Sequence, residues 1–417
     1  MKKLFSLFLL SLLLVQGVFA NGQKESEKEQ GPVVIRIQGY GGQDPAIVVR
    51  LLNEIIGQDL AAENIELVYE PIEGDYNAGI FNALSAGTAG DIVYLPVETA
   101  PGIIATGQIK PLNGLVDTSL FIESLIDSYT IDGNIYGIPK DFNTLEIFYN
   151  KDLFDEAGVE YLTENETWTT IAKKARAISK LGNDIYGICL QPGYDRFGAF
   201  AFGTGWTPFD KNGKTDLTDP RFKAAFTWYT DLIKEGAAVM ASDLGEGWGG
   251  GAFKTEQVGM AAEGSWMIGF LNNEAPNLPY GTAYMPSADK GVKGNFLYTV
   301  AYGINKQTKN MEAAVKVLEA LTSAKAQQFI LEQGLAIPSR KSLADNPFFE
   351  NETKEAQANK IVFKGASMGN VLGFQFGEYG TRWMEPVNSA LTQVASGDVS
   401  VDEALATAQE AINQLSK

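Results

Sequence analysis

Apolar and polar residues alternate with clear periods along the first part of the chain. The apolar runs typical of strands are Val33–Gln38, Ile65–Tyr69 and Asp91–Leu95. The segments with helical periodicity are Asp44–Ile56, Tyr76–Ser85 and Ala100–Thr106. This alternation of strands and helices predicts a parallel sheet with right-handed crossovers, which binds ligands at the carboxyl ends of its strands.

A second change of pattern occurs near residue 140. Ile135, Tyr136 and Ile138 form a short apolar strand that stops at Pro139. After a polar linker, Leu145–Tyr149 alternates with the period of a strand. Later helices have clear start signals, which are Thr167-Trp168, Asp219-Pro220 and the capping box Ser400–Glu403. The pattern therefore predicts an α/β protein with a linker between two strand-bearing regions.

The N-terminus has the features of a secretory signal peptide. Lys2 and Lys3 precede the apolar run Leu4–Val15, and Val18-Phe19-Ala20 is a small-residue cleavage site. Residues 1–20 are therefore expected to be removed after Ala20, and the polar residues 21–32 to form a disordered lead-in. The single cysteine, Cys189, lies far from that site, so no lipid anchor is expected. We expect an exported, periplasmic protein.

Composition excludes several kinds of chemistry. The chain has 51 acidic and 33 basic residues, a formal net charge of −18, and such a surface repels nucleic acid. It contains no histidine, which removes Ser-His-Asp and Cys-His catalysis and histidine-ligated metals. No cofactor or metal is expected, although calcium binding and carboxylate chemistry remain possible.

Two short motifs have simpler interpretations. Gly245, Gly247 and Gly250 fit G-x-G-x-x-G, but no βαβ unit follows. Asp210, Asn212 and Asp216 resemble a calcium loop, yet their spacing is not that of an EF-hand. A glycine-rich loop and a turn are the preferred interpretations.

The segment Asp132–Val159, DGNIYGIPKDFNTLEIFYNKDLFDEAGV, carries a family resemblance. It resembles the signature of family 1 extracellular solute-binding proteins, which are maltose-binding-protein-like receptors of sugar-importing ABC transporters. Further similar stretches are Phe253–Phe270 and Tyr302–Gly334. The resemblance implies a two-lobed periplasmic-binding-protein fold. In it, each lobe is a mostly parallel sheet flanked by helices, and the ligand cleft lies between the lobes.

The resemblance also implies how the chain divides. Lobe 1 is expected to contain residues 33–143 and 292–342, and lobe 2 residues 144–291 and 343–417. Three crossings between them are expected near residues 140–144, 286–293 and 341–347. The implied partners are a carbohydrate ligand and a membrane permease, with the receptor itself a monomer.

Candidate ligand-binding residues follow from these placements. Trp266 matches the cleft tryptophan of the family, because an aromatic face suits a sugar ring. Hydroxyl groups need planar polar partners, and the candidates on the crossing are Asp141, Asn143 and Thr144. Candidates after the predicted strands are Tyr40, Gln43, Asp44 and Glu98. Weaker candidates are Trp248, Glu263, Gln375, Arg382 and Trp383.

Two alternatives remain open from the sequence. The first is a receptor of the same class for a glycerol phosphodiester or an acidic oligosaccharide, for which Arg340 and Arg382 are suggestively placed. The second is a glycosidase that uses a carboxylate pair such as Asp141 and Glu98.

Overall fold

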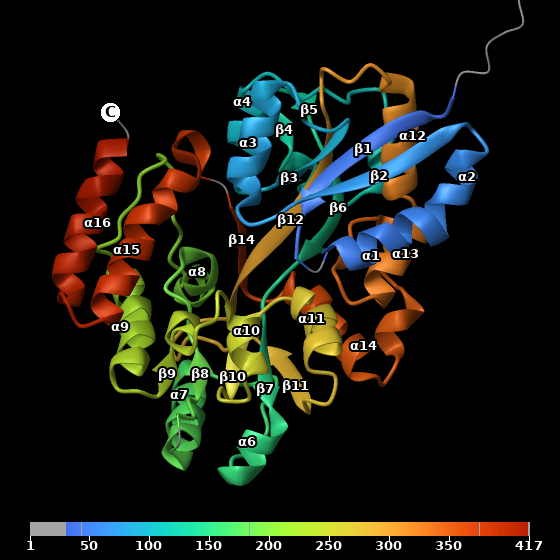
Figure 1. Ribbon diagram of the computed structural model, residues 1–417. Helices are drawn as coiled ribbons and strands as arrows, with labels where there is room; N and C mark the ends of the chain where they lie inside the picture. Colours follow the sequence, from blue (N-terminus) through green and yellow to red (C-terminus); the bar gives the residue numbers. More distant parts are fainter. Residues whose placement is uncertain (1–30, 43, 183, 375, 416–417) are drawn as a thin grey trace, which may run out of the picture.

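The computed structural model describes residues 31–42, 44–182, 184–374 and 376–415. They form two β-sheets flanked by helices, and the large sheet occupies the upper half of Figure 1 while the small sheet lies in the lower half. The predicted α/β class is confirmed. The predicted signal peptide, residues 1–20, lies outside the described residues.

The large sheet has the strand order β13–β6–β12–β3–β1–β2, with β14 paired to β12. Its strands are β1 (Val33–Tyr40), β2 (Ile65–Ile72), β3 (Ile92–Pro96), β6 (Ile138–Asn143), β12 (Gly294–Ile304), β13 (Ile337–Pro338) and β14 (Asn370–Gly373). Strand β1 pairs in parallel with β2 and β3, as the alternation of strands and helices predicts. The apolar runs of β1 and β3 are buried because helices cover both faces of this region.

The small sheet has the order β11–β7–β10–β8–β9. Its strands are β7 (Glu146–Asn150), β8 (Ile188–Cys189), β9 (Ala238–Val239), β10 (Met260–Glu263) and β11 (Tyr280–Tyr284). A separate hairpin pairs β4 (Thr130–Ile131) with β5 (Asn134–Ile135).

Both sheets are mixed, so the expected parallel pairing holds for only some of the strands. Strand β12 is antiparallel to β3 and β6, and β7 is antiparallel to β10 and β11. For β6 and β12, the path of the chain between the sheets explains the antiparallel pairing. Strand β6 runs out of the large sheet toward β7 in the small sheet, whereas β12 follows β11 of the small sheet and runs back into the large sheet in the opposite direction.

Helices surround each sheet (Figure 1). Those near the large sheet are α1 (Asp44–Arg50), α2 (Gly57–Ala61), α3 (Tyr76–Ala86), α4 (Ala100–Ala105), α5 (Glu123–Asp127), α12 (Met311–Leu321) and α13 (Ala324–Glu332). Those below and beside it are α6 (Lys151–Glu156), α7 (Trp168–Ile178), α8 (Tyr194–Gly203), α9 (Pro220–Lys234), α10 (Gly249–Lys254), α11 (Trp266–Glu274), α14 (Lys354–Gly365), α15 (Met384–Ala395) and α16 (Val401–Leu415). Short 3₁₀ turns are η2 (Thr118–Leu120), η3 (Ser179–Leu181), η4 (Ala241–Leu244), η5 (Lys341–Leu343), η6 (Pro347–Glu350) and η7 (Gly377–Trp383).

The helix starts agree with the capping signals in the sequence. The Thr167 and Thr170 side chains form a reciprocal capping box at α7. The Asp219 carboxylate caps α9, whose first residue is Pro220. The helix predicted over 44–56 differs, because its second half, Leu51–Ile56, is a π-helical segment (η1) and α2 continues it to Ala61.

The first residue of β7, Glu146, is a carboxyl group inside the protein. Its side chain is fully buried beneath α14, which packs across β7 and β11. Burial raises the pKa of Glu146 well above its ordinary value of 4.5, and the Thr282 side chain opposes this shift only in part. Burial therefore favours the neutral form of this carboxyl group in the folded protein.

We expect Glu146→Gln to stabilise the protein more at pH 8 than at pH 5. A raised folded pKa means that the native state binds a proton that the unfolded state releases, so wild-type stability is lost as the pH rises above about 4.5. Glutamine at this position does not titrate, so the variant does not lose this stability as the pH rises. Urea denaturation at the two pH values measures the effect, with Glu319→Gln on the exposed face of α12 as the control. An equal gain at both pH values would contradict the prediction.

Candidate functional site

A hollow of about 330 Å³ lies between the two sheets. Its lining residues are Tyr40, Gly41, Asp44, Glu98, Lys140, Asp141, Asn143, Trp266, Tyr298, Thr299, Val300, Leu335 and Ala336. Two further hollows of about 450 and 350 Å³ share Glu98 with it. One hollow is therefore lined by six of the predicted ligand-binding residues: Tyr40, Asp44, Glu98, Asp141, Asn143 and Trp266.

The topology explains why these residues converge. Tyr40 ends β1, and Glu98 lies two residues after the end of β3, the parallel neighbour of β1. Parallel strands present their carboxyl ends at one edge of the sheet. Asp141 and Asn143 lie on β6, the strand that leads into the small sheet, and Trp266 begins α11 on the other side.

The wall formed by the large sheet contains a buried ion pair. Lys140 Nζ contacts the Asp141 carboxylate, and the two side chains are 9% and 8% exposed. The Lys140 ammonium also lies 5.2 Å from the centroid of the Tyr94 ring. Burial opposes the charge on Lys140, but the carboxylates of Asp141 and Asp44 outweigh it and raise the pKa of the lysine. Lys140 is therefore a fixed cation at this wall.

Asp44 is the second acid near Lys140. It is buried, and its Oδ2 has no hydrogen-bond partner. Burial raises the pKa of Asp44 to about 6, against the opposing effect of Lys140. For Asp141, burial also raises the pKa, and the contact with Lys140 limits the shift. Two buried acids thus share a single cation on this wall.

Tyr40 is held by other tyrosines. Its ring packs edge-on against Tyr76 and Tyr94, with centroid distances of 4.9 and 5.4 Å. The Tyr69 hydroxyl donates a hydrogen bond to the Tyr40 carbonyl oxygen at 2.6 Å. This packing fixes an aromatic ring at the edge of the hollow.

The opposite wall is built on Trp266. The indole Nε1 donates to Glu263 Oε2 at 3.0 Å, and the Tyr298 ring packs edge-on at 5.2 Å. Gly264 is required beside the indole, because a Cβ at that position would lie 2.4 Å from indole Cζ3. Trp266 is only partly buried, so part of its surface faces the hollow.

A buried ion pair supports the indole. The Arg196 guanidinium lies 5.3 Å from the Trp266 ring, and its Nη2 donates to Glu263 Oε2 at 2.8 Å. Glu263 is 1% exposed and lies behind the hollow rather than in its lining. Arg196 also pairs with Asp195 at 2.8 Å. Arg196 and Glu263 are therefore positioning residues for Trp266.

The crossing from β6 to β7 is tied to both sides. Asn143 Oδ1 accepts from the Ser265 backbone N–H at 2.9 Å, and Asn143 Nδ2 donates to Ser265 Oγ at 2.9 Å. Thr144 is fully buried, and its hydroxyl donates to the Val362 carbonyl oxygen at 2.8 Å. Thr144 is therefore a structural anchor, and the prediction that it contacts a ligand does not fit this burial.

The other candidate tryptophans lie elsewhere. Trp383 is fully buried, stacks on Phe376 at 5.1 Å, and donates from Nε1 to Thr215 Oγ1 at 2.9 Å. The interpretation of Trp383 as a binding platform is therefore corrected, because core side chains cover both its ring and its polar atom. Trp248 packs edge-on against Phe270 at 4.8 Å and does not line the hollow.

The remaining candidates have mixed outcomes. Arg382 is exposed and lines the adjoining hollow of about 350 Å³. Gln43 and Gln375 lie outside the described residues. The sequence analysis missed Lys140, Arg196 and Tyr298. An isolated basic or aromatic residue produces no periodic pattern that would mark it as a site residue. The one available signal was that Lys140 directly precedes the predicted site residue Asp141.

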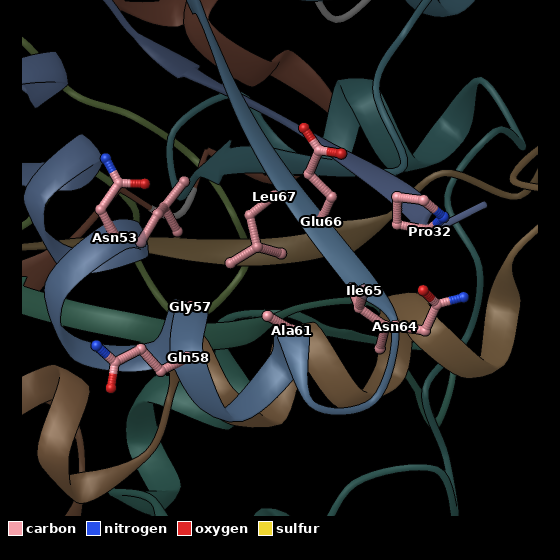
Figure 2. Close-up of a pocket in the computed structure, with 10 residues that line it drawn as sticks. Pro32, Asn53, Gly57, Gln58, Ala61, Asn64, Ile65, Glu66 and Leu67 are labelled. Atoms are coloured by element: carbon pink, nitrogen blue, oxygen red, sulfur yellow. The ribbon is translucent and has the colours of Figure 1, made fainter.

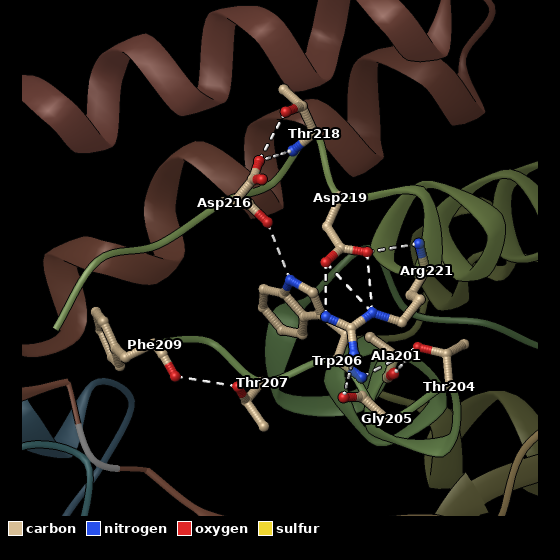
Figure 3. Close-up of polar contacts among 10 residues, drawn as sticks. All are labelled: Ala201, Thr204, Gly205, Trp206, Thr207, Phe209, Asp216, Thr218, Asp219 and Arg221. Atoms are coloured by element: carbon tan, nitrogen blue, oxygen red, sulfur yellow. Dashed lines mark hydrogen bonds and ion pairs between the residues drawn. The ribbon is translucent and has the colours of Figure 1, made fainter. Parts of the chain in front are cut away.

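The region that resembled a calcium loop is a set of turns (Figure 3). The Asp210 carboxylate accepts from the backbone N–H groups of Asn212 and Lys214, and the Asp216 carboxylate accepts from Thr218. Trp206 is 1% exposed and donates to the Asp216 carbonyl oxygen. These acids satisfy local backbone groups, as the preferred turn interpretation predicts. Among the described residues, no group of three or more metal-ligating side chains gathers in one place.

A larger hollow lies outside this site. Its volume is about 530 Å³, and it lies between β2 and the segment η1–α2, with lining residues such as Asn53, Gln58 and Leu67 (Figure 2). It shares no lining residue with the hollow at Trp266. No helix within the described ranges is long and apolar enough to span a membrane.

The chain is similar in sequence to binding proteins of several bacteria. The chain is 25% identical to the galactooligosaccharide-binding protein of Bacillus subtilis over 345 residues, covering 78% of this chain and 76% of that protein. It is 26% identical to the mannitol-binding protein of Pseudomonas aeruginosa over 341 residues, covering 73% and 76%.

Solved structures share the fold. The acarbose-binding GacH receptor of Streptomyces glaucescens superposes with a TM-score of 0.81 at 24% identity, covering 93% of this chain and 99% of that one. An ABC substrate-binding protein of Listeria monocytogenes, solved with cycloalternan, superposes with a TM-score of 0.82 at 20% identity, covering 92% and 98%. Residues 60–358 match the family described as bacterial extracellular solute-binding protein, and the chain belongs to that family.

Proposed function

We propose that this protein is the substrate-binding component of an ABC importer and captures a saccharide in the hollow between its two sheets. The observation that carries the proposal is the pairing of Trp266 on one wall with Asp141 and Asn143 on the other. An aromatic face packs against the C–H groups of a sugar ring, while carboxylate and amide groups bind its hydroxyls. The saccharide ligands of the named relatives support the same class.

The mechanism follows from the position of the site. We assign residues 33–143 and 292–342 to one lobe, and residues 144–291 and 343–417 to the other. A ligand that contacts both walls gains its full set of contacts only when the lobes close, so binding shifts the population toward the closed form. The β6–β7 crossing is then a hinge, and a membrane permease recognises the closed protein.

The alternative of an acidic ligand has no support from the position of Arg340. Arg340, which would favour an acidic ligand, donates to the Thr322 carbonyl oxygen at 2.6 Å, lies over the Phe121 ring, and is absent from the hollow's lining. The acids of the hollow are balanced only in part by Lys140, which disfavours an anion. We propose binding without catalysis, by a monomer, after export and cleavage behind Ala20.

A thermal-shift screen tests the proposal. A ligand of the native state alone raises the melting temperature by mass action, by about 2.7 kcal/mol of stability at 100 times its Kd. We expect neutral or amino saccharides, from mono- to tetrasaccharides, to raise the melting temperature. Glycerophosphodiesters and uronic-acid oligosaccharides should leave the melting temperature unchanged. A shift with the acidic compounds alone would contradict the proposal.

A further inference from the structure

The carboxylates around the hollow outnumber the cations. Asp44 and Asp141 share Lys140 on one wall, and Glu263 and Asp195 share Arg196 behind the other. Glu98 adds a fifth acid at the point where three hollows meet. Within the described part of the chain, no basic side chain forms an ion pair with Glu98. Glu98 is therefore an acid without a cationic partner where the three hollows meet.

Asp44 is a second, independent observation that points to a ligand in the hollow. Its side chain is 7% exposed, lines the hollow, and has an Oδ2 atom without a hydrogen-bond partner. Buried polar atoms are nearly always hydrogen-bonded, so a group left alone at a binding surface points to a ligand. Its nearest cation, Lys140, is already in contact with Asp141.

Tyr40 lies within the field of both acids. Burial contributes most to the raised pKa of its hydroxyl, and Glu98 and then Asp44 are among the charges that raise it further. Tyr40, Asp44 and Glu98 all line the same hollow. An aromatic ring beside two carboxylates is the combination that attracts an ammonium group, through the ring quadrupole and through charge-assisted hydrogen bonds.

We propose that the hollow prefers saccharides that carry a protonated amino group, which Asp44 and Glu98 bind beside Tyr40. This inference rests on the proposed saccharide-binding function. A sugar hydroxyl can donate a hydrogen bond to either acid but leaves its buried negative charge uncompensated. An ammonium group supplies the hydrogen bond and the opposite charge together, so it gains more than a hydroxyl at the same position.

The other charged groups around these acids do not remove the imbalance. Asp75 and Asp195 line the adjoining hollow with Glu98 and add negative charge. Arg382 lines the third hollow, is exposed, and has no ion pair to Glu98. Near Asp44 the charged neighbours are Lys140 and Asp141. Burial raises the pKa of Glu98 to about 7, with a small further contribution from Asp195.

Isothermal titration with matched sugars tests the inference. The probes are glucosamine, galactosamine and mannosamine, each compared with its neutral parent sugar and its N-acetyl derivative. We expect at least one amino sugar to bind 10-fold or more tightly than both of its counterparts at pH 6.5. Because Asp44 and Glu98 have pKa values of about 6 and 7, binding the ammonium form also releases protons. Titrations in buffers of different ionisation enthalpy detect that release, which neutral sugars lack.

Variants link the preference to its residues. Glu98→Gln and Asp44→Asn should each reduce the ratio of amino-sugar to neutral-sugar affinity at least 5-fold and reduce the proton release, while Glu319→Gln on α12 leaves both unchanged. Neutral sugars that bind as tightly as their amino counterparts would overturn this inference and leave the proposed function intact. If no sugar of either kind binds in this set or in the oligosaccharide screen, both fail.

Discussion

Arg196→Met should lower the free energy of unfolding by about 3–5 kcal/mol, the cost typical of breaking a buried ion pair from one side. The Arg196 side chain is 14% exposed and its partner Glu263 only 1% exposed. Removing the guanidinium leaves the Glu263 carboxylate buried without a cation, with the Trp266 indole N–H as its other donor. Urea denaturation of the ligand-free protein measures the loss.

An exposed arginine is the matched control. Arg221 pairs with Asp219 at 2.7 Å, as Figure 3 shows, but its side chain is 54% exposed. Arg221→Met should cost less than about 1 kcal/mol, as exposed ion pairs do. The double variant Arg196→Met with Glu263→Gln should recover part of the loss, because no charge stays buried. Equal losses for Arg196→Met and Arg221→Met would refute the supporting role of the buried pair.

Trp266→Ala should weaken saccharide binding about 10-fold to 100-fold, which corresponds to about 1–3 kcal/mol for one large side chain. The indole is partly buried and faces the hollow, so its removal deletes contact surface for the sugar ring. Titration calorimetry with the best saccharide of the thermal screen measures the change. An unchanged affinity would remove Trp266 from the site.

Trp383 gives the contrasting result. It is fully buried among Phe376, Tyr194 and Trp206, so Trp383→Ala should cost about 3–5 kcal/mol of stability, as large-to-small core substitutions do. Trp266→Ala should cost less stability and more affinity. If Trp266→Ala is the more destabilising of the two, Trp266 is the core residue and the wall assignment fails.

Periodicity predicted the strands and several helix starts, because these depend on local pattern. The apolar runs of β1, β2 and β3 and the cap at Thr167 all lie where the sequence places them. The π-helical segment Leu51–Ile56 was not predicted, since π-helices are rare and occur mostly as single turns inside α-helices. The antiparallel pairings of β12 were missed because pairing direction depends on the path of the chain between the sheets.

The site was predictable where topology and chemistry coincide. Tyr40 and Glu98 follow parallel strands, so their convergence could be expected from the order of elements alone. Local pattern alone could not separate Trp383 from Trp266, because a tryptophan in a turn has the same pattern whether core or ligand covers it; only the family resemblance ranked Trp266 first. Arg196 was missed since its role depends on Glu263, which is 67 residues away.

Small-angle scattering can show whether a saccharide closes the two lobes around the hollow at Trp266. The β6–β7 crossing carries Asn143, which binds Ser265 on the opposite wall, and we expect the two walls to move about this segment. We predict that a saturating saccharide from the thermal screen reduces the radius of gyration, and that the same concentration has a smaller effect on Trp266→Ala. An unchanged radius of gyration for the wild-type protein at saturation, verified by calorimetry, would contradict closure.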